Sequence, residues 1–346
     1  MPDKFIQLVA AGRILSPEQV AEAVEWLVTE SVPATAKADF LAELARRGET
    51  VEEIAAFAQS LRTKSILPSL DGEMRSREIL DVCGTGGDHL GTFNISTTVA
   101  IVCAAAGVPV AKHGNRAITS QAGSADVLEA LGIRIDFSPE EAVRSLREHN
   151  FAFFFAPNFH PAFKHIAPAR KLCAERKQRT IFNVLGPLLN PARPTAQLVG
   201  VPRPELCEPI ARVLQSLGVR RAMVVNGRVS ADATLDELST LGANRVAEFY
   251  QERGFAVSEL VPDQFPLQPA KLQDLLGADR HANAEIVRQI LNGKEKGPKR
   301  DAVLLNAGAA LFVAGKARSI ADGWEVAAKV IDDGRASAKL LALGAR

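Results

Sequence analysis

The fold is decided by one stretch of the sequence, Ile79-Leu80-Asp81-Val82-Cys83-Gly84-Thr85-Gly86-Gly87-Asp88. Its first half is a short apolar run of the kind that forms a buried strand, and its second half is a loop rich in glycine. Similar apolar runs recur along the chain, and helical patterns separate them. Strands that alternate with helices predict a mostly parallel sheet covered by helices on both faces.

The remaining elements of this α/β region follow from the same patterns. After the first strand, at residues 79–83, further strands are expected at residues 108–111, 151–155, 198–201 and 222–225. Helices are expected at residues 97–106, 125–131, 139–149 and 204–217, and residues 302–343 are predicted to be largely helical. The locally basic stretch 293–300 is interpreted as an exposed loop.

The first 65 or so residues are predicted to be helical throughout. Ser16-Pro17-Glu18-Gln19 and Thr50-Val51-Glu52-Glu53 are both capping boxes, which satisfy free N–H groups at the start of a helix. Between them a helix is expected over residues 36–47, with Glu43 and Arg47 four positions apart and Gly48 able to end it. We therefore expect a small helical domain over residues 1–70 and an α/β domain over residues 75–346.

Composition narrows the range of functions. The chain has 346 residues, more than a single core usually holds, and its net charge of +1 gives no general attraction to nucleic acid or to an anionic membrane. The amino terminus has no signal-peptide pattern, and the longest uncharged stretches are too short to span a bilayer. The cysteines form no C-x-x-C pair, so they suggest neither a zinc site nor a disulfide framework. A reducing cytoplasm is therefore expected for Cys83, Cys103, Cys173 and Cys207.

The glycine-rich loop is the first candidate site. Gly84, Gly86 and Gly87 allow the backbone to approach an anion closely and to direct N–H groups at it. The segment Asn94-Ile95-Ser96-Thr97 precedes an apolar helix, and helix N-termini favour phosphate. The loop has neither the Walker A lysine nor the dinucleotide-binding pattern. By itself it indicates either an anion near a strand end or a tight structural turn.

A polar cluster follows the next expected strand. Lys112-His113-Gly114-Asn115-Arg116 places two cations, an imidazole and an amide at the C-terminal end of a strand, where open α/β sheets bind ligands. Thr119, Ser120 and Ser124 come directly afterwards and can hold phosphate oxygens. A solvated basic loop is the alternative interpretation. Asp126 is interpreted as a cap of the next helix.

Two further segments carry chemistry. Asp236 and Glu237 stand between apolar residues, and adjacent carboxylates suit Mg²⁺, although such pairs are also common at helix N-termini. Between residues 155 and 191, prolines and aromatic residues surround Arg170, which lies at helical spacing from His160 and Phe163. Because arginine is the usual partner of a planar carboxylate, this segment predicts a hydrophobic pocket with a carboxylate clamp. A packing hinge between domains is the alternative, and both can hold.

Together these motifs closely resemble those of the anthranilate phosphoribosyltransferases, the enzymes of the second step of tryptophan biosynthesis. The similarity covers nearly the whole chain, and the matching segments occur in the family's order: residues 84–88, 94–97, 112–116, 123–126, 182–191 and 236–237. The resemblance implies a nucleoside-phosphorylase-like phosphoribosyltransferase fold, in which residues 170–190 join the small helical domain at the hinge. It also implies a homodimer.

The resemblance implies specific site residues. Phosphoribosyl pyrophosphate (PRPP) is expected to bind Gly84, Gly87, Asp88, Thr92, Asn94, Ile95, Ser96, Thr97, Lys112, His113, Gly114, Asn115, Arg116, Ala117, Ile118, Thr119, Ser120 and Ser124. Anthranilate is expected to contact or lie near Gly84, His113, Asn115, Pro157, Phe163 and Arg170. Two Mg²⁺ ions are expected at Ser96, Asp236 and Glu237.

The implied reaction is attack of the anthranilate amine on the anomeric carbon of PRPP, with loss of pyrophosphate. An aromatic amine is already neutral near neutral pH, so no strong general base is required and no catalytic acid or base is assigned. Stabilisation of the charge that develops on pyrophosphate is expected to supply part of the rate. Alignment of the amine with the ribose is expected to supply much of the rest.

Three departures from the family pattern affect geometry. The segment 172–179 is a few residues longer than the family's usual link between Arg170 and Thr180, which leaves the hinge geometry open. Asn226 stands in the region where a histidine often precedes the acidic pair, and Thr234 replaces a frequent glycine. The loop around the metals is therefore expected to differ in shape.

Two other functions are compatible with the same fold. A pyrimidine nucleoside phosphorylase would use free phosphate and would not need Asp236 and Glu237. A non-catalytic relative that binds nucleic acid should be strongly basic and should lack Arg170 or the acidic pair. The neutral net charge and the complete set of motifs favour the phosphoribosyltransferase.

Overall fold

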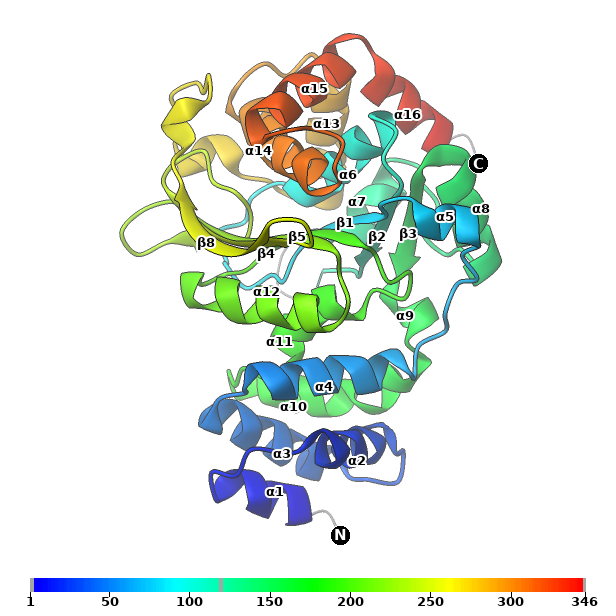
Figure 1. Ribbon diagram of the computed structural model, residues 1–346, viewed down its shortest axis with the longest axis vertical. Coiled ribbons are helices and arrows are strands. Elements are labelled where there is room, and N and C mark those ends of the chain that lie inside the picture. Colours follow the sequence, from blue (N-terminus) through cyan, green and yellow to red (C-terminus); the bar gives the residue numbers. More distant parts are fainter. Residues whose placement is uncertain (1–2, 118–120, 345–346) are drawn as a thin grey trace.

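The protein is described here by a computed structural model that covers residues 3–117 and 121–344. Two parts are stacked along its long axis (Figure 1). The lower part in this view consists of helices, and the upper part is built around one sheet. None of the described helices is both long enough and apolar enough to cross a membrane.

The helical part combines the amino terminus with a helix from the middle of the chain (Figure 1). Its helices are α1 (Asp3–Ala10), α2 (Pro17–Val28), α3 (Ala34–Arg47), α4 (Val51–Arg62) and α10 (Ala167–Glu175). Both predicted capping boxes form, before α2 and before α4. Glu43 and Arg47, although four positions apart, do not pair with each other: Glu43 pairs with Arg46, and Arg47 pairs with the buried Glu53.

The sheet confirms the expected mostly parallel arrangement. Its strand order is β3-β2-β1-β4-β5-β7-β8, and β6 pairs with β5. The first five strands in this order are parallel, whereas β6, β7 and β8 are antiparallel. The bounds are β1 (Leu80–Gly84), β2 (Val110–Gly114), β3 (Phe151–Phe155), β4 (Ala196–Gly200), β5 (Arg221–Arg228), β6 (Thr234–Leu235), β7 (Asn244–Tyr250) and β8 (Gly254–Leu260).

Two details of the sheet differ from the sequence analysis. Strands β7 and β8 were not predicted, because charged residues interrupt their apolar runs and β8 is largely exposed at the sheet edge. Strand β2 extends to Gly114, so Lys112 and His113 belong to the strand and not to the loop after it. The buried Lys112 is kept in the strand because its Nζ donates to Val82 O on the neighbouring strand, at 2.6 Å.

Helices cover both faces of the sheet (Figure 1). One face carries α6 (Ile95–Ala105), α13 (Arg280–Leu291), α14 (Pro298–Val313), α15 (Ile320–Asp332) and α16 (Arg335–Gly344). The other face carries α11 (Phe182–Leu185) and α12 (Cys207–Ser216). The remaining helices are α5 (Gly72–Ser76), α7 (Ser124–Ala130), α8 (Pro139–His149) and α9 (Ala156–Phe159), with single 3₁₀ turns at Pro161–His165, Gly186–Leu189, Pro204–Leu206, Pro262–Gln264 and Leu272–Leu275.

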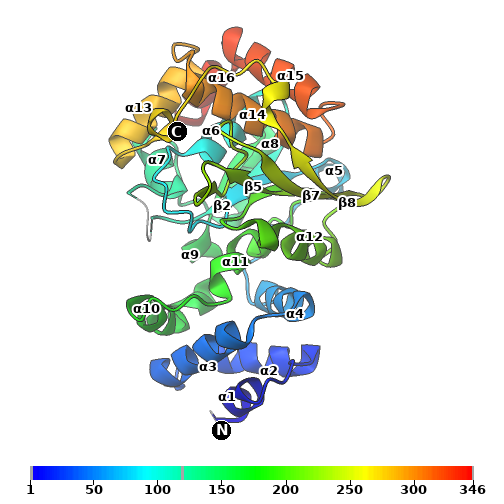
Figure 2. The same cartoon turned by 90° about the vertical axis from the view of Figure 1, so that its left-hand side faces the viewer.

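The helical part and the sheet share one apolar core. Alternate residues of a strand face opposite sides, so Leu198 packs with the helices around α14 while Val199 packs toward α12. The core around Val199 continues through α11 into the helical part, where it includes Phe40 and Phe57. Figure 2 shows α11 between the sheet and the helical part. This continuous core fixes the position of the helical part relative to the sheet.

The basic stretch 293–300 is only partly the exposed loop that the sequence suggested. Helix α14 begins at Pro298, and Arg300 is buried, with its guanidinium paired to Asp332 at 2.8 Å. The charges of this stretch therefore stabilise the contact between α14 and α15.

Helices α14 and α15 cross at two glycines. A Cβ added at Gly323 would overlap Gly308 O, and one added at Gly308 would meet Trp324 N at 2.9 Å. We expect Gly323→Val to lower the free energy of unfolding by about 1–3 kcal/mol, because the extra atoms overpack a buried contact. Urea unfolding measures this. Gly72→Val is the control, because a Cβ there meets nothing within 4 Å; equal losses for the two variants would contradict the expectation.

Candidate active site

The carboxyl ends of the parallel strands meet along one edge of the sheet. Gly84, which ends β1, is the register partner of Gly200, which ends β4. The segment after β6 crosses this edge so closely that a Cβ at Gly84 would overlap Asp236 Oδ2, and a Cβ at Gly200 would overlap Asp236 O. The glycine-rich loop and the acidic pair, separated by about 150 residues in the chain, therefore lie in contact.

The glycine-rich loop is shaped by two left-handed residues. Gly86 and Gly87 have φ values of 77° and 94°, which residues with a Cβ rarely adopt. Gly86 N donates to Asp236 Oδ2 at 2.7 Å, and Thr85 N donates to Gly200 O at 2.9 Å. The loop is thus held against both the acidic pair and the neighbouring strand.

Three carboxylates gather beside this loop. Asp236 N donates to Asp88 Oδ2 at 3.4 Å, which brings Asp88 to the acidic pair. Burial raises the pKa of Asp236, and the nearby charges of Asp88 and Glu237 raise it further. Burial also raises the pKa of Glu237, against the opposing effect of Lys112. None of the three carboxylates forms a salt bridge with another described residue, so the cluster favours a bound cation.

The surroundings of the acidic cluster fit Mg²⁺. Among the described residues, no group of three or more His, Cys, Asp or Glu side chains is arranged to hold a metal ion alone. Mg²⁺ is commonly held by one or two carboxylates together with substrate phosphates, which matches Asp236 and Glu237. Ser96 lies beside them, because its N–H donates to Glu237 Oε1 at 3.2 Å. These are the three residues expected to hold metal.

A buried polar network supports the site from below. Lys112 Nζ donates to Ser96 Oγ at 3.3 Å as well as to Val82 O. Beneath it, Asp81 accepts from Asn190 Nδ2 at 2.8 Å and from His113 N at 3.3 Å. Burial raises the pKa of Asp81 to about 6, while Lys112 opposes that rise. Individual roles for Asp81 and Asn190 were not predicted from the sequence, although a carboxylate within an apolar strand was a usable signal.

The first turn of α6 faces the same edge. Asn94 precedes the helix, and its side chain joins two distant segments by donating to Ala122 O at 3.1 Å and accepting from Asn283 Nδ2 at 2.9 Å. Ile95 and Thr97 are buried in this turn, and Thr92 lies in the preceding segment, bridged to Leu276. The N-terminus of α6 thus lies near the acidic cluster, as phosphate binding there would require.

The loop from β2 to α7 carries the remaining residues expected to bind PRPP. A Cβ at Gly114 would overlap Ser124 Oγ, so the two ends of this loop touch, and Ala117 N donates to Asp126 Oδ2 at 3.0 Å. Asp126 caps α7, as predicted. Arg116 pairs with Glu129 at 2.5 Å and with Asp126 at 3.1 Å, so its charge is compensated by α7. Ile118, Thr119 and Ser120 lie outside the described residues.

A ladder of rings leads from this edge to Arg170. His113 and His160 have ring centroids 5.1 Å apart, His160 stacks on Phe163 at 5.2 Å, and Phe163 meets Phe182 edge-on at 5.8 Å. The guanidinium of Arg170 lies 5.2 Å from the centroid of Phe182. It has no hydrogen bond or salt bridge with the described residues, and burial lowers its pKa. The predicted clamp is thus a partly buried arginine without a carboxylate.

The two histidines of the ladder are held neutral. Burial lowers the pKa of His113 to about 3 and that of His160 to about 4. Their Nε2 atoms are 3.2 Å apart, and His113 Nδ1 lies 3.3 Å from Gly186 O. His160 was noted in the sequence only for its spacing from Arg170; its contact with His113 depends on tertiary structure.

Two residues expected near anthranilate lie outside these contacts. Pro157 is exposed on α9, and Asn115 is exposed in the loop after β2, where its Oδ1 accepts from Arg116 N at 2.8 Å. Among the described residues, no side-chain hydrogen bond joins either of them to the ring ladder or to Arg170. Both lie after the carboxyl ends of their strands, on the same edge as Gly84.

The unusual segments have defined roles in the structure. In the longer stretch 172–179, α10 ends at Glu175, and Arg176 pairs with Asp39 of the helical part at 3.0 Å. Near the acidic pair, Asn226 Nδ2 donates to Val201 O at 2.8 Å and approaches Leu235 O at 3.5 Å. Thr234 Oγ1 donates to Pro202 O at 2.7 Å. Asn226 and Thr234 thus tether the acidic segment to the strand end after β4.

Comparison with known proteins identifies the family. Residues 76–337 match the family described as "Glycosyl transferase family, a/b domain", and residues 3–65 match "Glycosyl transferase family, helical bundle domain". The anthranilate phosphoribosyltransferase of Petrotoga mobilis is 46% identical over 97% of this chain and 94% of its own length. That of Thermomicrobium roseum is 47% identical over 98% and 95%. The chain belongs to the anthranilate phosphoribosyltransferase family.

Solved structures of the family share the whole architecture. The anthranilate phosphoribosyltransferase of Thermus thermophilus is 41% identical, with a TM-score of 0.88 over 99% of this chain and 98% of that one. The Saccharomyces cerevisiae enzyme "in complex with PRPP and Mg" is 28% identical, with a TM-score of 0.81 over 94% and 90%. The same yeast enzyme "in complex with 4-fluoroanthranilate" has a TM-score of 0.84. The expected fold class and family are confirmed.

The buried His160 should make stability depend on pH. Its pKa of about 4 in the folded protein lies below the ordinary value of 6.5, so the unfolded chain binds the proton first as pH falls. The destabilising effect of His160 on the folded state is absent above pH 6.5. It grows as the pH falls from 6.5 to about 4. Wild type should therefore lose about 2 kcal/mol more unfolding free energy than His160→Gln between pH 7 and pH 5, in urea titrations.

The exposed His281 supplies the control for this measurement. A His281→Gln variant should keep the wild-type dependence on pH, because this substitution leaves the buried His160 in place. If His160→Gln and wild type lost equal stability on acidification, the neutral state of His160 would be disproved.

Proposed function

We propose that the chain transfers the phosphoribosyl group of PRPP to the amine of anthranilate, giving N-(5-phosphoribosyl)anthranilate and pyrophosphate in tryptophan biosynthesis. The observation that carries this proposal is one continuous arrangement. It begins at an anion-binding edge with three carboxylates and runs along a ladder of rings to an arginine that lacks a carboxylate partner. The family membership supports the same reaction.

PRPP is assigned to the strand edge. Its pyrophosphate would lie against the loop Gly84–Asp88 and the N-terminus of α6, with the segment after β2 closing the site. Magnesium held by Ser96, Asp236 and Glu237 would neutralise the charge that grows on the leaving pyrophosphate. Lys112 acts from below, because its Nζ reaches Ser96 Oγ and its charge favours the ionised form of Glu237.

Anthranilate is assigned to the ring ladder. Its carboxylate would pair with Arg170, whose planar guanidinium matches a carboxylate in two parallel hydrogen bonds. Its ring would pack among His113, Phe163 and the neighbouring aromatic side chains. Pro157 and Asn115 would border this path, and Gly84 would lie between the two substrates.

The chain's main catalytic contribution is then positioning. The two neutral histidines add no positive charge beside the amine, so that the lone pair of the amine stays available for attack. A fixed separation between Arg170 and the strand edge would align the amine with the anomeric carbon. No general base is needed for an amine that is neutral before it reacts.

Three finer features complete the proposal. Two Mg²⁺ ions per subunit would be held by the acidic cluster and would offset the negative charge of the pyrophosphate. The active form would be a homodimer, and the location would be the cytoplasm, where the four free cysteines stay reduced. The yeast enzyme "in complex with PRPP and Mg" supports the use of magnesium.

A pyrimidine nucleoside phosphorylase is not favoured, because it would leave the acidic cluster without a role.

The reaction is tested directly by the fluorescence of anthranilate. Purified protein with PRPP and Mg²⁺ should consume that fluorescence, because the amine becomes substituted. Chelation of Mg²⁺ should stop the reaction, and added Mg²⁺ should restore it. Constant fluorescence at saturating PRPP, Mg²⁺ and anthranilate would rule out the proposed function.

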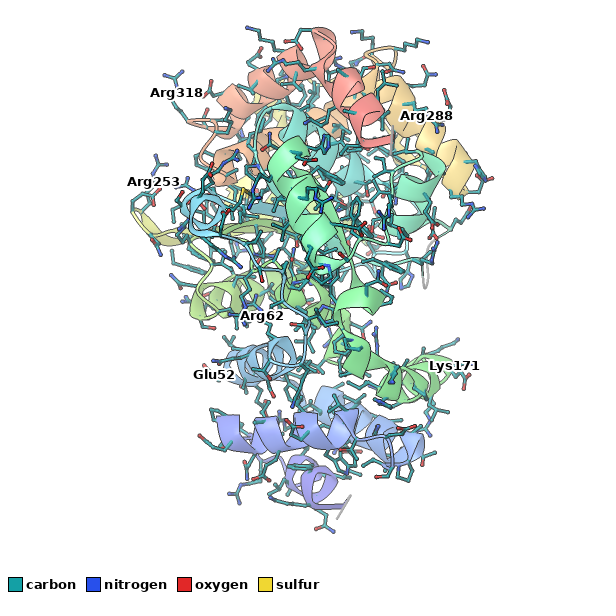
Figure 3. All side chains as sticks on the ribbon, turned by 90° about the vertical axis from the view of Figure 1, so that its right-hand side faces the viewer. Glu52, Arg62, Lys171, Arg253, Arg288 and Arg318 are labelled. Atoms are coloured by element: carbon teal, nitrogen blue, oxygen red, sulfur yellow. The ribbon has the colours of Figure 1, made fainter. Side chains whose placement is uncertain are left out.

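The clamp is tested by replacing Arg170. Arg170→Ala should raise the KM for anthranilate by about tenfold or more and change the KM for PRPP little, because it removes charge-assisted hydrogen bonds to one substrate only. The control is Lys171→Ala, since Lys171 is the next residue of α10 and is exposed (Figure 3). An anthranilate KM that matched the control would place the clamp elsewhere.

A further inference from the structure

A cavity lies at the edge of the sheet opposite the candidate active site. Its volume is about 370 Å³. It is bounded by the end of α4, by the residues that enter β4 and by the turn that enters β5; among its lining residues are Gln59, Arg62, Thr63, Arg193, Thr195 and Ser216. Because β4 and β5 begin here and end at the active site, the two sites are separated by the length of the strands.

Arg62 is the buried cation of this cavity. Its Nε donates to Leu188 O at 2.6 Å, while its two terminal nitrogens have no hydrogen-bond acceptor among the described residues. Those two nitrogens are not among the fully buried side-chain atoms that lack a partner, and Arg62 lines the cavity. They are therefore accessible from the cavity. Arg62, which Figure 3 shows where the helical part meets the sheet part, thus offers free donors to the cavity. Burial, with a smaller effect of Arg193, lowers its pKa to about 10.

Two more arginines add positive charge without adding a carboxylate. Arg193 is exposed on the cavity wall and forms no salt bridge with the described residues. Arg75 uses its Nη1 on two carbonyls, Ala192 O at 2.8 Å and Arg193 O at 3.3 Å, and its pKa is lowered by burial and by Arg193. Three guanidiniums therefore gather without a salt bridge to any of the described residues.

A carboxylate that contacts the cavity wall at Thr195 already has a cationic partner. Glu78 pairs with Arg220 at 3.2 Å and also accepts the hydroxyl of Thr195 at 2.6 Å. It therefore neutralises Arg220 and leaves Arg62, Arg75 and Arg193 without a counter-charge among the described residues.

Capping of helix ends does not account for these arginines. Helices α4 and α12 both end at the cavity, and guanidiniums can serve as partners for the last carbonyls of a helix. Here backbone N–H groups already fill that role: Thr63 N donates to Ser60 O, and Gly218 N donates to Gln215 O. The guanidinium of Arg62 donates instead to Leu188 O, outside both helices. The free donors of this cavity therefore need another acceptor.

We propose that this cavity binds a phosphate-type oxyanion between Arg62 and Arg193. Guanidinium groups pair with phosphate oxygens in two parallel hydrogen bonds, and the local excess of positive charge favours a dianion. The volume exceeds that of one phosphate group, so a phosphorylated small molecule fits as well as the free ion. The site is separate from the PRPP site and does not depend on the proposed transferase activity.

Binding here would act on the hinge between the two parts of the molecule. Arg62 belongs to α4, whereas Arg193 and Ser216 belong to the α/β part, so one ligand would join them. Arg62 also holds the carbonyl of Leu188, in the short 3₁₀ turn whose Gly186 carbonyl meets His113. An oxyanion would therefore stiffen the connection between the hinge and the ring ladder.

The test is thermal unfolding with inorganic phosphate, at constant ionic strength, for wild type, Arg193→Gln and Arg253→Gln. Arg253 is the matched control, because it is an exposed arginine without a salt bridge to the described residues, on the turn between β7 and β8 (Figure 3). Phosphate should raise the unfolding temperature of wild type and of Arg253→Gln at the same concentrations. Arg193→Gln should need at least about tenfold more phosphate for the same rise, since it loses charge-assisted hydrogen bonds.

Phosphate that binds only at the PRPP site would raise the unfolding temperature of all three proteins equally, and that result would overturn the proposal. Without phosphate, Arg193→Gln should unfold near the wild-type temperature because Arg193 is exposed. Ribose 5-phosphate as a second probe distinguishes the sources. A shift that depends on Arg193 identifies a sugar-phosphate site, and a dependence seen only with inorganic phosphate identifies a site for the free ion.

Discussion

The close approach of Gly84 to the Asp236 carboxylate is the constraint on which the site depends. It requires a residue without a Cβ at the end of β1, and it places a buried carboxylate against the N–H of Gly86. Once Asp236 is fixed there, Asp88 and Glu237 must lie beside it, because both are tied to the same backbone region. Three carboxylates held together in a low-dielectric environment repel each other, so the folded chain gains from a divalent cation.

The shared apolar core links this strand edge to the helical part that carries Arg170. The core around Val199 and Leu214 runs without interruption from the sheet into the helical part. Arg170 lies on α10, which packs against α3, so its distance from the strand edge is set by the packing of the helical part and not by its own strand. The ring ladder bridges the two, and its histidines stay neutral because they are desolvated.

Charge is distributed unevenly between the two edges of the sheet. The edge at the carboxyl ends holds an excess of acidic groups, namely Asp88, Asp236 and Glu237. The opposite edge holds an excess of positive charge on Arg62, Arg75 and Arg193, which have no salt bridge with the described residues. Each excess is costly to maintain in a partly buried setting unless a ligand of opposite charge binds. The net charge of +1 reveals neither local excess, because it is a sum over all charged residues of the chain.

The sequence alone determined the local elements and named the candidate residues of the site. The capping boxes at Ser16 and Thr50, the first strand and the glycine loop were predictable, because each depends on interactions between residues that are close in the chain. The tertiary structure decided which distant side chains meet. It paired Arg47 with Glu53 and Arg116 with Glu129, buried Lys112 above Asp81 and set His160 against His113. These pairings depend on how whole helices and strands pack against each other. A short stretch of sequence does not specify that packing.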